Sequence, residues 1–301
     1  MRPDGRFLLA RRPEGKPCAG YWEFPGGKVM PDESLPRALQ RELREELGIH
    51  VERPHPWVTR TFSYPHATVR LHFYRVTEWH GEPQPRENQA LSWQLAHRLE
   101  VEPMLPANAP VLRALELPSI YAITRATETG THAALHRLQI ALEQGLRLIQ
   151  VREKSMAKEA LADFARAVIA LARRHGARVL VNSDTGDADF CREAGADGVH
   201  LSSLRLMMLN KRPDAEWCGA SCHNAEELFQ AQQLEMDFAV LGPVLPTLSH
   251  PGSPALGWRK FAAMVRECSI PVYALGGLRK DDLATAQEHG AHGLALMRGI
   301  A

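Results

Sequence analysis

The chain has 301 residues, a length that suits two domains of typical size. Its 36 Lys and Arg against 35 Asp and Glu, with 45% hydrophobic residues, exclude a disordered chain and a strongly basic surface, so we expect no stable nucleic-acid partner. No apolar run approaches the roughly 20 residues of a membrane helix, and the first residues lack the apolar core of a signal peptide. We therefore expect a cytoplasmic protein without membrane contact. The five scattered cysteines lack Cys-x-x-Cys spacing and are expected to be reduced.

The first part of the chain has the pattern of an α+β domain. Apolar runs predict a strand at Arg6–Ala10 and a long strand at Thr68–Trp79. Between them, a helix is predicted over Ser34–Leu47, with the serine as its N-cap and Gly48 as its C-terminal stop.

This helix carries an unusual set of acidic residues. Four leucines at four-residue spacing form a stripe that should pack against a sheet, and Glu46 falls inside that stripe. Glu42, Glu45 and Glu46 repel one another by roughly 0.2–0.5 kcal/mol per pair unless a cation lies between them. Carboxylates without nearby Cys or His favour Mg²⁺ or Mn²⁺ over zinc. The alternative for the glutamates alone is a solvated face balanced by the arginines of the same helix.

The surrounding residues decide between these alternatives. From Gly27 to Ile49 the sequence reproduces Gly-x5-Glu-x7-Arg-Glu-U-x-Glu-Glu-x-Gly-U, where U is a bulky aliphatic residue, and Phe24-Pro25-Gly26-Gly27-Lys28 leads into it. Residues 1 to about 115 thus resemble a Nudix hydrolase of the MutT type, with the α+β Nudix fold. The resemblance implies catalytic roles for Glu33, Arg41, Glu42, Glu45 and Glu46.

Within that resemblance, Mg²⁺, or alternatively Mn²⁺, is bound by Glu42, Glu45 and Glu46. Glu42 is also a candidate general base, and Glu33 and Arg41 support the loop and the helix. A further acidic ligand is usual before the last strand; Glu87 is the nearest candidate, because Ser92 stands where a glutamate is expected.

The implied substrate is a nucleoside triphosphate, cleaved between its α and β phosphates. The residues that match nucleotide-binding positions of MutT-type enzymes are Arg12, Phe24, Gly26, Gly27 and Asn108. An asparagine amide both donates and accepts, so Asn108 can read the altered edge of 8-oxoguanine. Its alternative role is that of a helix cap.

Nudix domains of this type begin with a strand that precedes Arg6–Ala10, and Met1 stands where that strand should end. We expect either that the start is mis-set or that the strand is lost, which would expose a sheet edge.

Proline and polar residues at 103–118 predict a domain boundary near residue 117, giving domains over 1–117 and 118–301. After it, helical segments alternate with β-rich runs, which predicts a parallel α/β (βα)8 TIM barrel whose closing helix is absent or short. The eight predicted strands are Ile120–Thr124, Leu148–Arg152, Val179–Asn182, Gly198–Leu201, Cys218–Cys222, Phe238–Val244, Pro271–Gly277 and Gly293–Met297.

Motifs at the ends of these strands resemble thiamine phosphate synthase and the related thiazole tautomerase. The resemblance implies that Gln150, Arg152 and Lys154 bind a pyrimidine pyrophosphate and that Gly276 and Gly277 receive a thiazole phosphate. Loops after strands seven and eight of such barrels commonly bind phosphate. The further barrel positions matched to the family are Asn182, Ser221, His223 and Thr247.

Several positions depart from the synthase pattern. Asn182 is followed by Ser183 where the family has aspartate, although Asp184 comes next; Arg205 lies where another acid is expected, and His250 replaces a phosphate-binding lysine. These changes predict weak synthase activity. His223 matches the catalytic histidine of the tautomerase; a capping or packed histidine is the alternative.

The sequence thus predicts an enzyme with a nucleotide as substrate, hydrolysing 8-oxo-dGTP to 8-oxo-dGMP and pyrophosphate, fused to a thiamine-phosphate-synthase-like barrel that binds thiamine-pathway phosphates. One alternative is a thiamine-pathway enzyme whose first half cleaves a thiamine-type pyrophosphate. Another is a barrel that only binds its ligand.

Overall fold

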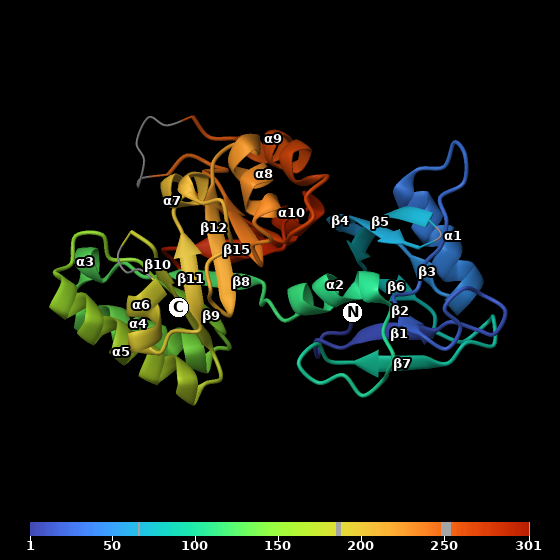
Figure 1. Ribbon diagram of the computed structural model, residues 1–301, viewed down its shortest axis with the longest axis horizontal. Helices are drawn as coiled ribbons and strands as arrows, with labels where there is room; N and C mark the ends of the chain where they lie inside the picture. The colour runs from blue at the N-terminus through green and yellow to red at the C-terminus, as the bar shows by residue number, and fades with distance from the viewer. Residues whose placement is uncertain (66, 185–187, 248–253, 301) are drawn as a thin grey trace. The chain divides into compact units, whose positions relative to one another are not determined.

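The computed structural model describes residues 1–65, 67–184, 188–247 and 254–300 (Figure 1). The chain forms two compact units: the N-terminal unit comprises Met1–Pro56 and Thr61–Glu116, and the barrel unit comprises Trp57–Arg60 and Leu117–Ala301. Among the described residues, no helix has both the length and the apolar character needed to cross a membrane.

The N-terminal unit combines short antiparallel sheets with one long helix. A three-stranded sheet has the order β2-β1-β7, and two further pairs join β3 to β6 and β4 to β5. The elements are β1 (Phe7–Arg11), β2 (Trp22–Glu23), α1 (Leu35–Leu47), β3 (His50–Val51), β4 (His55–Tyr64), β5 (Ala67–Arg75), β6 (Trp79–His80), β7 (Leu91–Gln94), the 3-10 helix η1 (Pro106–Asn108) and α2 (Ala109–Leu115).

Helix α1 is confirmed, and it buries the predicted stripe. Leu43 and Leu47 are buried against Ile49 and Val51, with the more N-terminal leucines half-buried. The helix ends at Gly48, whose φ of 72° is left-handed and whose N–H donates to Arg44 O, as a C-terminal glycine should. The predicted serine cap makes no side-chain capping hydrogen bond.

The prediction of one long strand at Thr68–Trp79 was wrong. β5 ends at Arg75, and Trp79–His80 forms the separate strand β6. β6 pairs with β3, directly after α1, and the Trp79 ring stacks on Trp93 with 6.1 Å between centroids. The sequence pattern is that of one strand, but its two ends pair with different strands in the folded domain, so the structure has two strands.

The eight-stranded parallel barrel predicted for the second part is confirmed. Its strands close in the order β10-β11-β12-β13-β14-β15-β8-β9. The strands are β8 (Ile120–Ile123), β9 (Leu148–Val151), β10 (Arg178–Asn182), β11 (Gly198–Leu201), β12 (Trp217–Cys222), β13 (Phe238–Leu241), β14 (Val272–Leu275) and β15 (Gly293–Leu296).

Helices cover the outside of the barrel (Figure 1). They are α3 (Ala126–Thr129), α4 (Thr131–Glu143), α5 (Lys158–Arg174), α6 (Ala188–Ala194), α7 (Ser203–Met208), α8 (Ala225–Gln233), α9 (Gly257–Val265), η2 (Lys280–Asp282) and α10 (Leu283–Glu288). One apolar cluster fills the layer between helices and strands, and a second, including Tyr121, Trp217, Phe238 and Tyr273, fills the interior. The interior is therefore a packed core, and ligands can be received only at its ends.

The five cysteines are free thiols, and four of them are buried. Burial raises the pKa of Cys222 and Cys268, so these two thiols stay protonated and act as core residues.

Candidate functional sites

Arg41 organises the acidic residues of the N-terminal unit. Its Nε and Nη2 each donate to a different carboxylate oxygen of Glu33 at 3.0 Å. Its Nη1 donates to Glu42 at 2.8 Å and to Glu45 at 3.2 Å. Nη2 also donates to Lys28 O at 2.9 Å, which ties the preceding loop to the helix. The hydrogen bonds from Arg41 lower the pKa of Glu33, so both groups stay charged at neutral pH.

Glu46 is the carboxylate that is least well neutralised. Burial raises its pKa to about 7, and the negative charges of Glu87 and Glu42 contribute to the rise. Its Oε2 accepts a hydrogen bond from Gly26 N at 3.2 Å, which fixes the side chain against the Phe24–Lys28 loop. A buried carboxylate near other carboxylates is a position that a cation would stabilise.

Glu87 lies beside this group, although it is 41 residues from Glu46 in sequence. Its carboxylate is paired with Lys16 Nζ at 2.6 Å, and its N–H donates to Gln89 Oε1 at 2.7 Å. Gln89 in turn donates to Glu46 O at 2.9 Å, so the Glu87 loop is attached to the end of α1.

The loop lies close to the helix at its two glycines. A Cβ atom on Gly27 would lie 2.2 Å from the Glu42 carboxyl, and Gly26 has a φ of 147°, which favours glycine. The φ of Gly26 therefore accounts for the first glycine, and a side chain at Gly27 would have to displace the Glu42 carboxylate.

The residues predicted to bind the nucleotide are linked through β2. Arg12 Nη1 pairs with both carboxylate oxygens of Glu23, at 2.6 and 2.7 Å. Phe24 follows directly and packs with Phe7 and Phe73 at centroid distances of 5.7 and 5.8 Å. The structure therefore places Arg12 and Phe24 at the start of the loop whose Gly26 binds Glu46.

Asn108 is attached to the same strand. Trp22 N donates to Pro103 O, Leu105 N donates to Trp22 O, and Asn108 N donates to Leu105 O. The Asn108 side chain is 4% exposed, makes no capping hydrogen bond with α2, and its Nδ2 has no hydrogen-bond partner among the described residues. A buried amide donor without a partner costs about 1–3 kcal/mol, so a role in capping does not account for it.

In the barrel unit, a directional chain of hydrogen bonds crosses the carboxyl ends of the strands. Asn182 Nδ2 donates to Gln150 Oε1 at 3.0 Å, and Gln150 Nε2 donates to the Tyr121 hydroxyl at 3.1 Å. The Tyr121 hydroxyl lies 3.1 Å from His200 Nδ1, and His200 Nε2 lies 2.9 Å from Ser221 Oγ.

The protonation states along this chain follow from its partners. Burial raises the pKa of Tyr121, so its hydroxyl keeps its proton. Because this hydroxyl already accepts from Gln150 Nε2, we assign its proton to the bond with His200 Nδ1. Burial, with the charge of Arg152, lowers the pKa of His200 to about 3, so the ring is neutral and Nε2–H donates to Ser221. Ser221 therefore accepts from His200 and keeps its own proton to donate elsewhere.

Lys154 and Asp184 meet at the same end of the barrel. Lys154 Nζ lies 2.9 Å from Asp184 Oδ2, and the Ser202 hydroxyl donates to Asp184 Oδ1 at 2.6 Å. Burial alone would raise the pKa of Asp184, but the hydrogen bonds from Ser202 and Lys154 outweigh it and lower the pKa. A carboxylate thus stands one residue beyond Ser183, paired with a predicted phosphate-binding cation.

The two glycines after β14 form a tight contact with the loop after β13. Gly277 has a φ of 68°, and a Cβ there would lie 2.6 Å from Pro246 O; a Cβ on Gly276 would lie 2.6 Å from Pro243 Cβ. Leu245 N donates to Gly276 O at 3.1 Å. Thr247, predicted for the same site, ends the described part of this loop, and His250 lies outside the described residues.

A family model described as "NUDIX domain" matches residues 1–115, and one described as "Thiamine monophosphate synthase" matches residues 120–300. The chain belongs to both families. Over 111 residues it is 43% identical to "CTP pyrophosphohydrolase" of Escherichia coli and 40% identical to "8-oxo-dGTP diphosphatase" of Haemophilus influenzae, in each case covering 37% of this chain and 82% of the relative. Over 188 residues it is 32% identical to "Thiamine-phosphate synthase" of Thioalkalivibrio sulfidiphilus, covering 61% of this chain and 88% of the relative. The chain is thus an enzyme with a Nudix hydrolase domain and a thiamine-phosphate synthase domain.

The Nudix carboxylates have the chemistry that suits a hard divalent cation, as is general in this family. In the described conformation, however, no group of three or more His, Cys, Asp or Glu side chains is arranged to hold a metal ion. Glu42 and Glu45 instead face Arg41, and Glu87 faces Lys16. The carboxylates therefore fit a divalent ion chemically. To bind one, their side chains would have to release Arg41 and Lys16.

In the synthase domain, His223 lies apart from the hydrogen-bond chain described above. It is half-exposed, and its Nδ1 lies 3.0 Å from Glu227 of the helix that follows. Asn224, not His223, caps α8 by accepting from Glu227 N.

Sequence reasoning missed three residues of these sites. Lys16 supplies the cation for Glu87, and Tyr121 and His200 connect Gln150 to Ser221. The signal for the last two was available, because a tyrosine and a histidine inside otherwise apolar barrel strands need buried partners.

Proposed function

We propose that the Nudix domain is a Mg²⁺-dependent pyrophosphohydrolase that converts 8-oxo-dGTP to 8-oxo-dGMP and pyrophosphate, which removes an oxidised nucleotide before DNA replication. The observation that carries this proposal is the buried Asn108 amide, whose Nδ2 has no partner among the described residues. Oxidation turns N7 of guanine from an acceptor into a donor, and an asparagine amide can pair with the altered edge through both of its groups.

The carboxylates of α1 would hold the ion, with Glu42, Glu45 and Glu46 as ligands and Glu87 as a fourth. Bound Mg²⁺ would supply neutralisation of phosphate charge and activation of water. Glu46 has the strongest need for a cation, because burial raises its pKa to about 7. Mn²⁺ satisfies the same oxygen ligands.

Chain residues position the remaining parts of the reaction. Arg41 holds Glu33, Glu42 and the Lys28 carbonyl together, which keeps the loop fixed against the helix. Glu46 joins the helix to the same loop at Gly26, and Arg12 pairs with Glu23 of β2, the strand that leads into this loop. We place the base of the nucleotide near Phe24 and Asn108 and its phosphates near the α1 carboxylates, with Glu42 as the general base.

A hydrolysis panel tests this proposal against its alternatives. The full-length chain is assayed with 8-oxo-dGTP, dGTP, CTP and thiamine diphosphate, with Mg²⁺, with Mn²⁺ and with chelator. We expect the highest kcat/KM for 8-oxo-dGTP and release of pyrophosphate. A preference for CTP, the substrate named for the 43% identical relative, or for thiamine diphosphate would refute it.

We propose for the barrel that it binds a phosphorylated thiazole and a pyrimidine pyrophosphate through Gln150, Arg152, Lys154 and Gly277, but condenses them slowly. Support comes from Lys154, whose ammonium is already paired with Asp184, and from Ser183, which replaces a family carboxylate. Pyrophosphate departure builds negative charge that must be stabilised, and fewer groups are available here to do so. Tautomerisation by His223 stays an alternative.

Calorimetry with thiazole phosphate and an assay of thiamine phosphate formation separate these possibilities. Binding with slow synthesis is expected. Synthesis at rates ordinary for the family would contradict our interpretation of Ser183, and the absence of any binding would contradict the proposed ligand.

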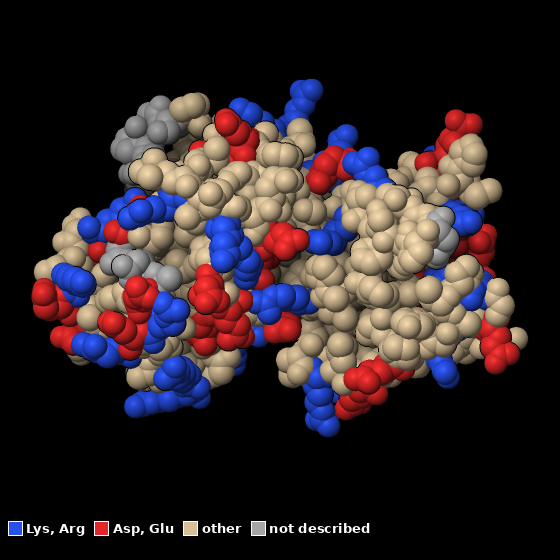
Figure 2. All heavy atoms as spheres, viewed as in Figure 1, with Lys and Arg blue, Asp and Glu red and all other residues tan. Residues whose placement is uncertain are grey.

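We further propose that the enzyme acts in the cytoplasm without a stable nucleic-acid partner. On the face drawn in Figure 2, Lys and Arg side chains are interspersed with Asp and Glu rather than gathered into a basic patch. Because nucleic-acid affinity depends on clustered positive charge, this arrangement supports the use of free nucleotides.

A further inference from the structure

Four large apolar side chains are exposed on two neighbouring helices of the barrel. Leu204, Met207 and Met208 lie on α7 and Phe229 lies on α8, and they are between 41% and 70% exposed. Among the described residues of the barrel unit, these are all of the large apolar side chains that are exposed. A single exposed apolar side chain is ordinary, but a group of four on adjoining helices indicates a surface that another molecule covers.

The four side chains belong to one continuous surface. Helices α7 and α8 are in contact, and Gln230, which follows Phe229, donates through Nε2 to Leu209 O at 2.7 Å, directly after Met208. Leu204 and Met208 are four residues apart in α7, so they lie on the same side of that helix. We call the surface formed by the four side chains the α7–α8 face.

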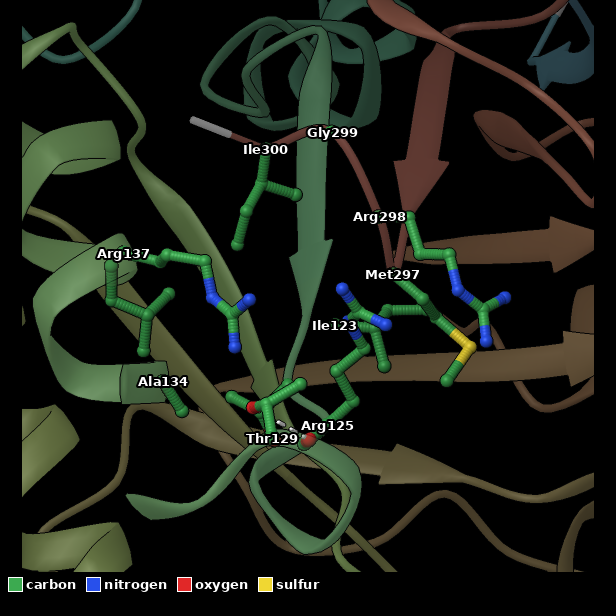
Figure 3. Close-up of a pocket in the computed structure, with 11 residues that line it drawn as sticks. Ile123, Arg125, Thr129, Ala134, Arg137, Met297, Arg298, Gly299 and Ile300 are labelled. Atoms are coloured by element: carbon green, nitrogen blue, oxygen red, sulfur yellow. Dashed lines mark hydrogen bonds between the residues drawn. The ribbon is translucent and has the colours of Figure 1, made fainter. Parts of the chain in front are cut away.

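The α7–α8 face is separate from the pocket drawn in Figure 3. That pocket is lined by the end of β8, by α3 and α4 and by the segment after β15, and by none of the four exposed side chains. In the closed strand order, β8 and β15 lie across the barrel from β11 and β12, the strands that α7 and α8 follow. Small molecules bind in concave pockets, whereas this face is formed by the outer sides of two helices, so a protein surface is the fitting partner.

Charged residues beside the α7–α8 face indicate which protein surface it fits. Arg205 is exposed and lies one turn before Met208, and Glu226 is exposed and lies one turn before Phe229. Neither charge forms an ion pair with another residue of the described chain. Both helices follow parallel strands and run in the same direction, so the two charges lie at the same end of the face. A twofold axis parallel to the helices would set α7 against α8 of a second copy, with Arg205 opposite Glu226 of the partner subunit at two symmetric places.

We propose that the α7–α8 face is the contact between two copies of this chain, in a symmetric dimer with an apolar centre and two ion pairs between Arg205 and Glu226. Methionine, phenylalanine and arginine are among the residue types enriched in protein interfaces. A standard interface buries roughly 800 Å² per partner, and four apolar side chains form a small centre for one, so we expect the dimer to dissociate in the micromolar range. The proposal also gives a role to Arg205, which departs from the synthase pattern, and it does not depend on the substrate of either domain.

The test is sedimentation velocity of the full-length chain at concentrations from about 1 to about 200 µM, where a weak dimer forms and dissociates. Met208→Gln and Phe229→Gln should each raise the dissociation constant of the dimer about tenfold or more, because each removes part of the apolar centre. Met30→Gln, the same change at an exposed methionine of the N-terminal unit, should leave the dissociation constant within about twofold of the parent. A parent that stays monomeric over this range, or association that Met208→Gln and Phe229→Gln leave unchanged, would overturn the proposal.

An exchange of charges tests whether the partner is a second copy in the twofold arrangement. Arg205→Glu and Glu226→Arg should each weaken self-association, because each sets two pairs of like charges against one another. In an equimolar mixture of these two variants, a mixed dimer has both ion pairs again, with their signs exchanged at one of the two places. The mixture should therefore associate about as tightly as the parent, whereas a mixture that associates no better than the single variants would overturn the arrangement.

Discussion

Acidification should destabilise the barrel through His200. The ring is fully buried, and its pKa falls from 6.5 to about 3, first because of burial and then because of Arg152. In the unfolded chain, His200 binds a proton below about pH 6.5. In the folded chain, it binds one only below about pH 3. The contribution of His200 to the free energy of unfolding is therefore fully present above pH 6.5, and it is lost as the pH falls from about 6.5 to about 3.

The size of the effect follows from the same two values. At pH 5 the folded state is disfavoured by about 2 kcal/mol relative to pH 7, and the full loss near pH 3 approaches about 5 kcal/mol, at about 1.4 kcal/mol per pKa unit. Protonation would also place a second donor against the Tyr121 hydroxyl, which already donates to Nδ1.

The assay is urea unfolding at pH 7 and pH 5, with hydrogen exchange of barrel peptides to assign the transition to this domain. The parent should lose about 2 kcal/mol between the two pH values more than His200→Gln does. We expect the variant to be less stable than the parent at both pH values. The quantity compared is therefore the change in the free energy of unfolding between pH 7 and pH 5. Equal losses in both proteins, or an NMR titration of His200 near pH 6, would refute the reasoning.

Four other predictions test the sites. Glu45→Gln should lower pyrophosphohydrolysis by at least about 100-fold with nearly unchanged folding by circular dichroism, and activity within a few-fold of the parent would contradict the metal assignment. Asn108→Ala should lower the kcat/KM ratio of 8-oxo-dGTP to dGTP by about tenfold or more, and an unchanged ratio would remove it from base recognition. Gly277→Ala should destabilise the barrel by about 1–2 kcal/mol or more in melting experiments, and more than Gly176→Ala, where φ is 62° but no atom lies within 4 Å. Ser183→Asp should accelerate Mg²⁺-dependent thiamine phosphate formation, measured against the parent; no gain would show that another group limits the rate.

The barrel could be predicted because its strands are short, continuous apolar runs between turn residues. Gly198–Leu201 is the same in prediction and structure. The strand predicted to reach Val244 stops at Leu241, because Pro243 has no N–H to donate to a ladder. Apolar runs and turn residues are local features of the sequence. Their eightfold repetition is what predicts a closed barrel.

The N-terminal unit was less predictable, in part because β1 and β3 pair with strands that are distant in sequence. β4, over His55–Tyr64, was not foreseen, although apolar and polar residues alternate in part of it. β6 was merged with β5 because nothing in the local pattern marks the change of partner at Trp79. Pairing between remote segments is a tertiary property that a pattern within one window does not contain.

The two candidate sites also differ in how far their contacts could be predicted from the sequence. The Nudix motif names Glu33 and Arg41, and the structure joins them by two hydrogen bonds of 3.0 Å. No spacing rule predicts that Lys154 pairs with Asp184, because the two residues follow different strands and meet only when β9 and β10 pair.

Both sites share one electrostatic arrangement. At each site, carboxylates with a predicted role are paired with a cation of the same domain: Arg41 pairs with Glu42 and Glu45, and Lys154 pairs with Asp184. A phosphate ligand competes for these cations, and the carboxylate that is released keeps its negative charge but loses its counterion, which a divalent ion can replace. Binding of phosphate and of metal should therefore favour each other at both sites.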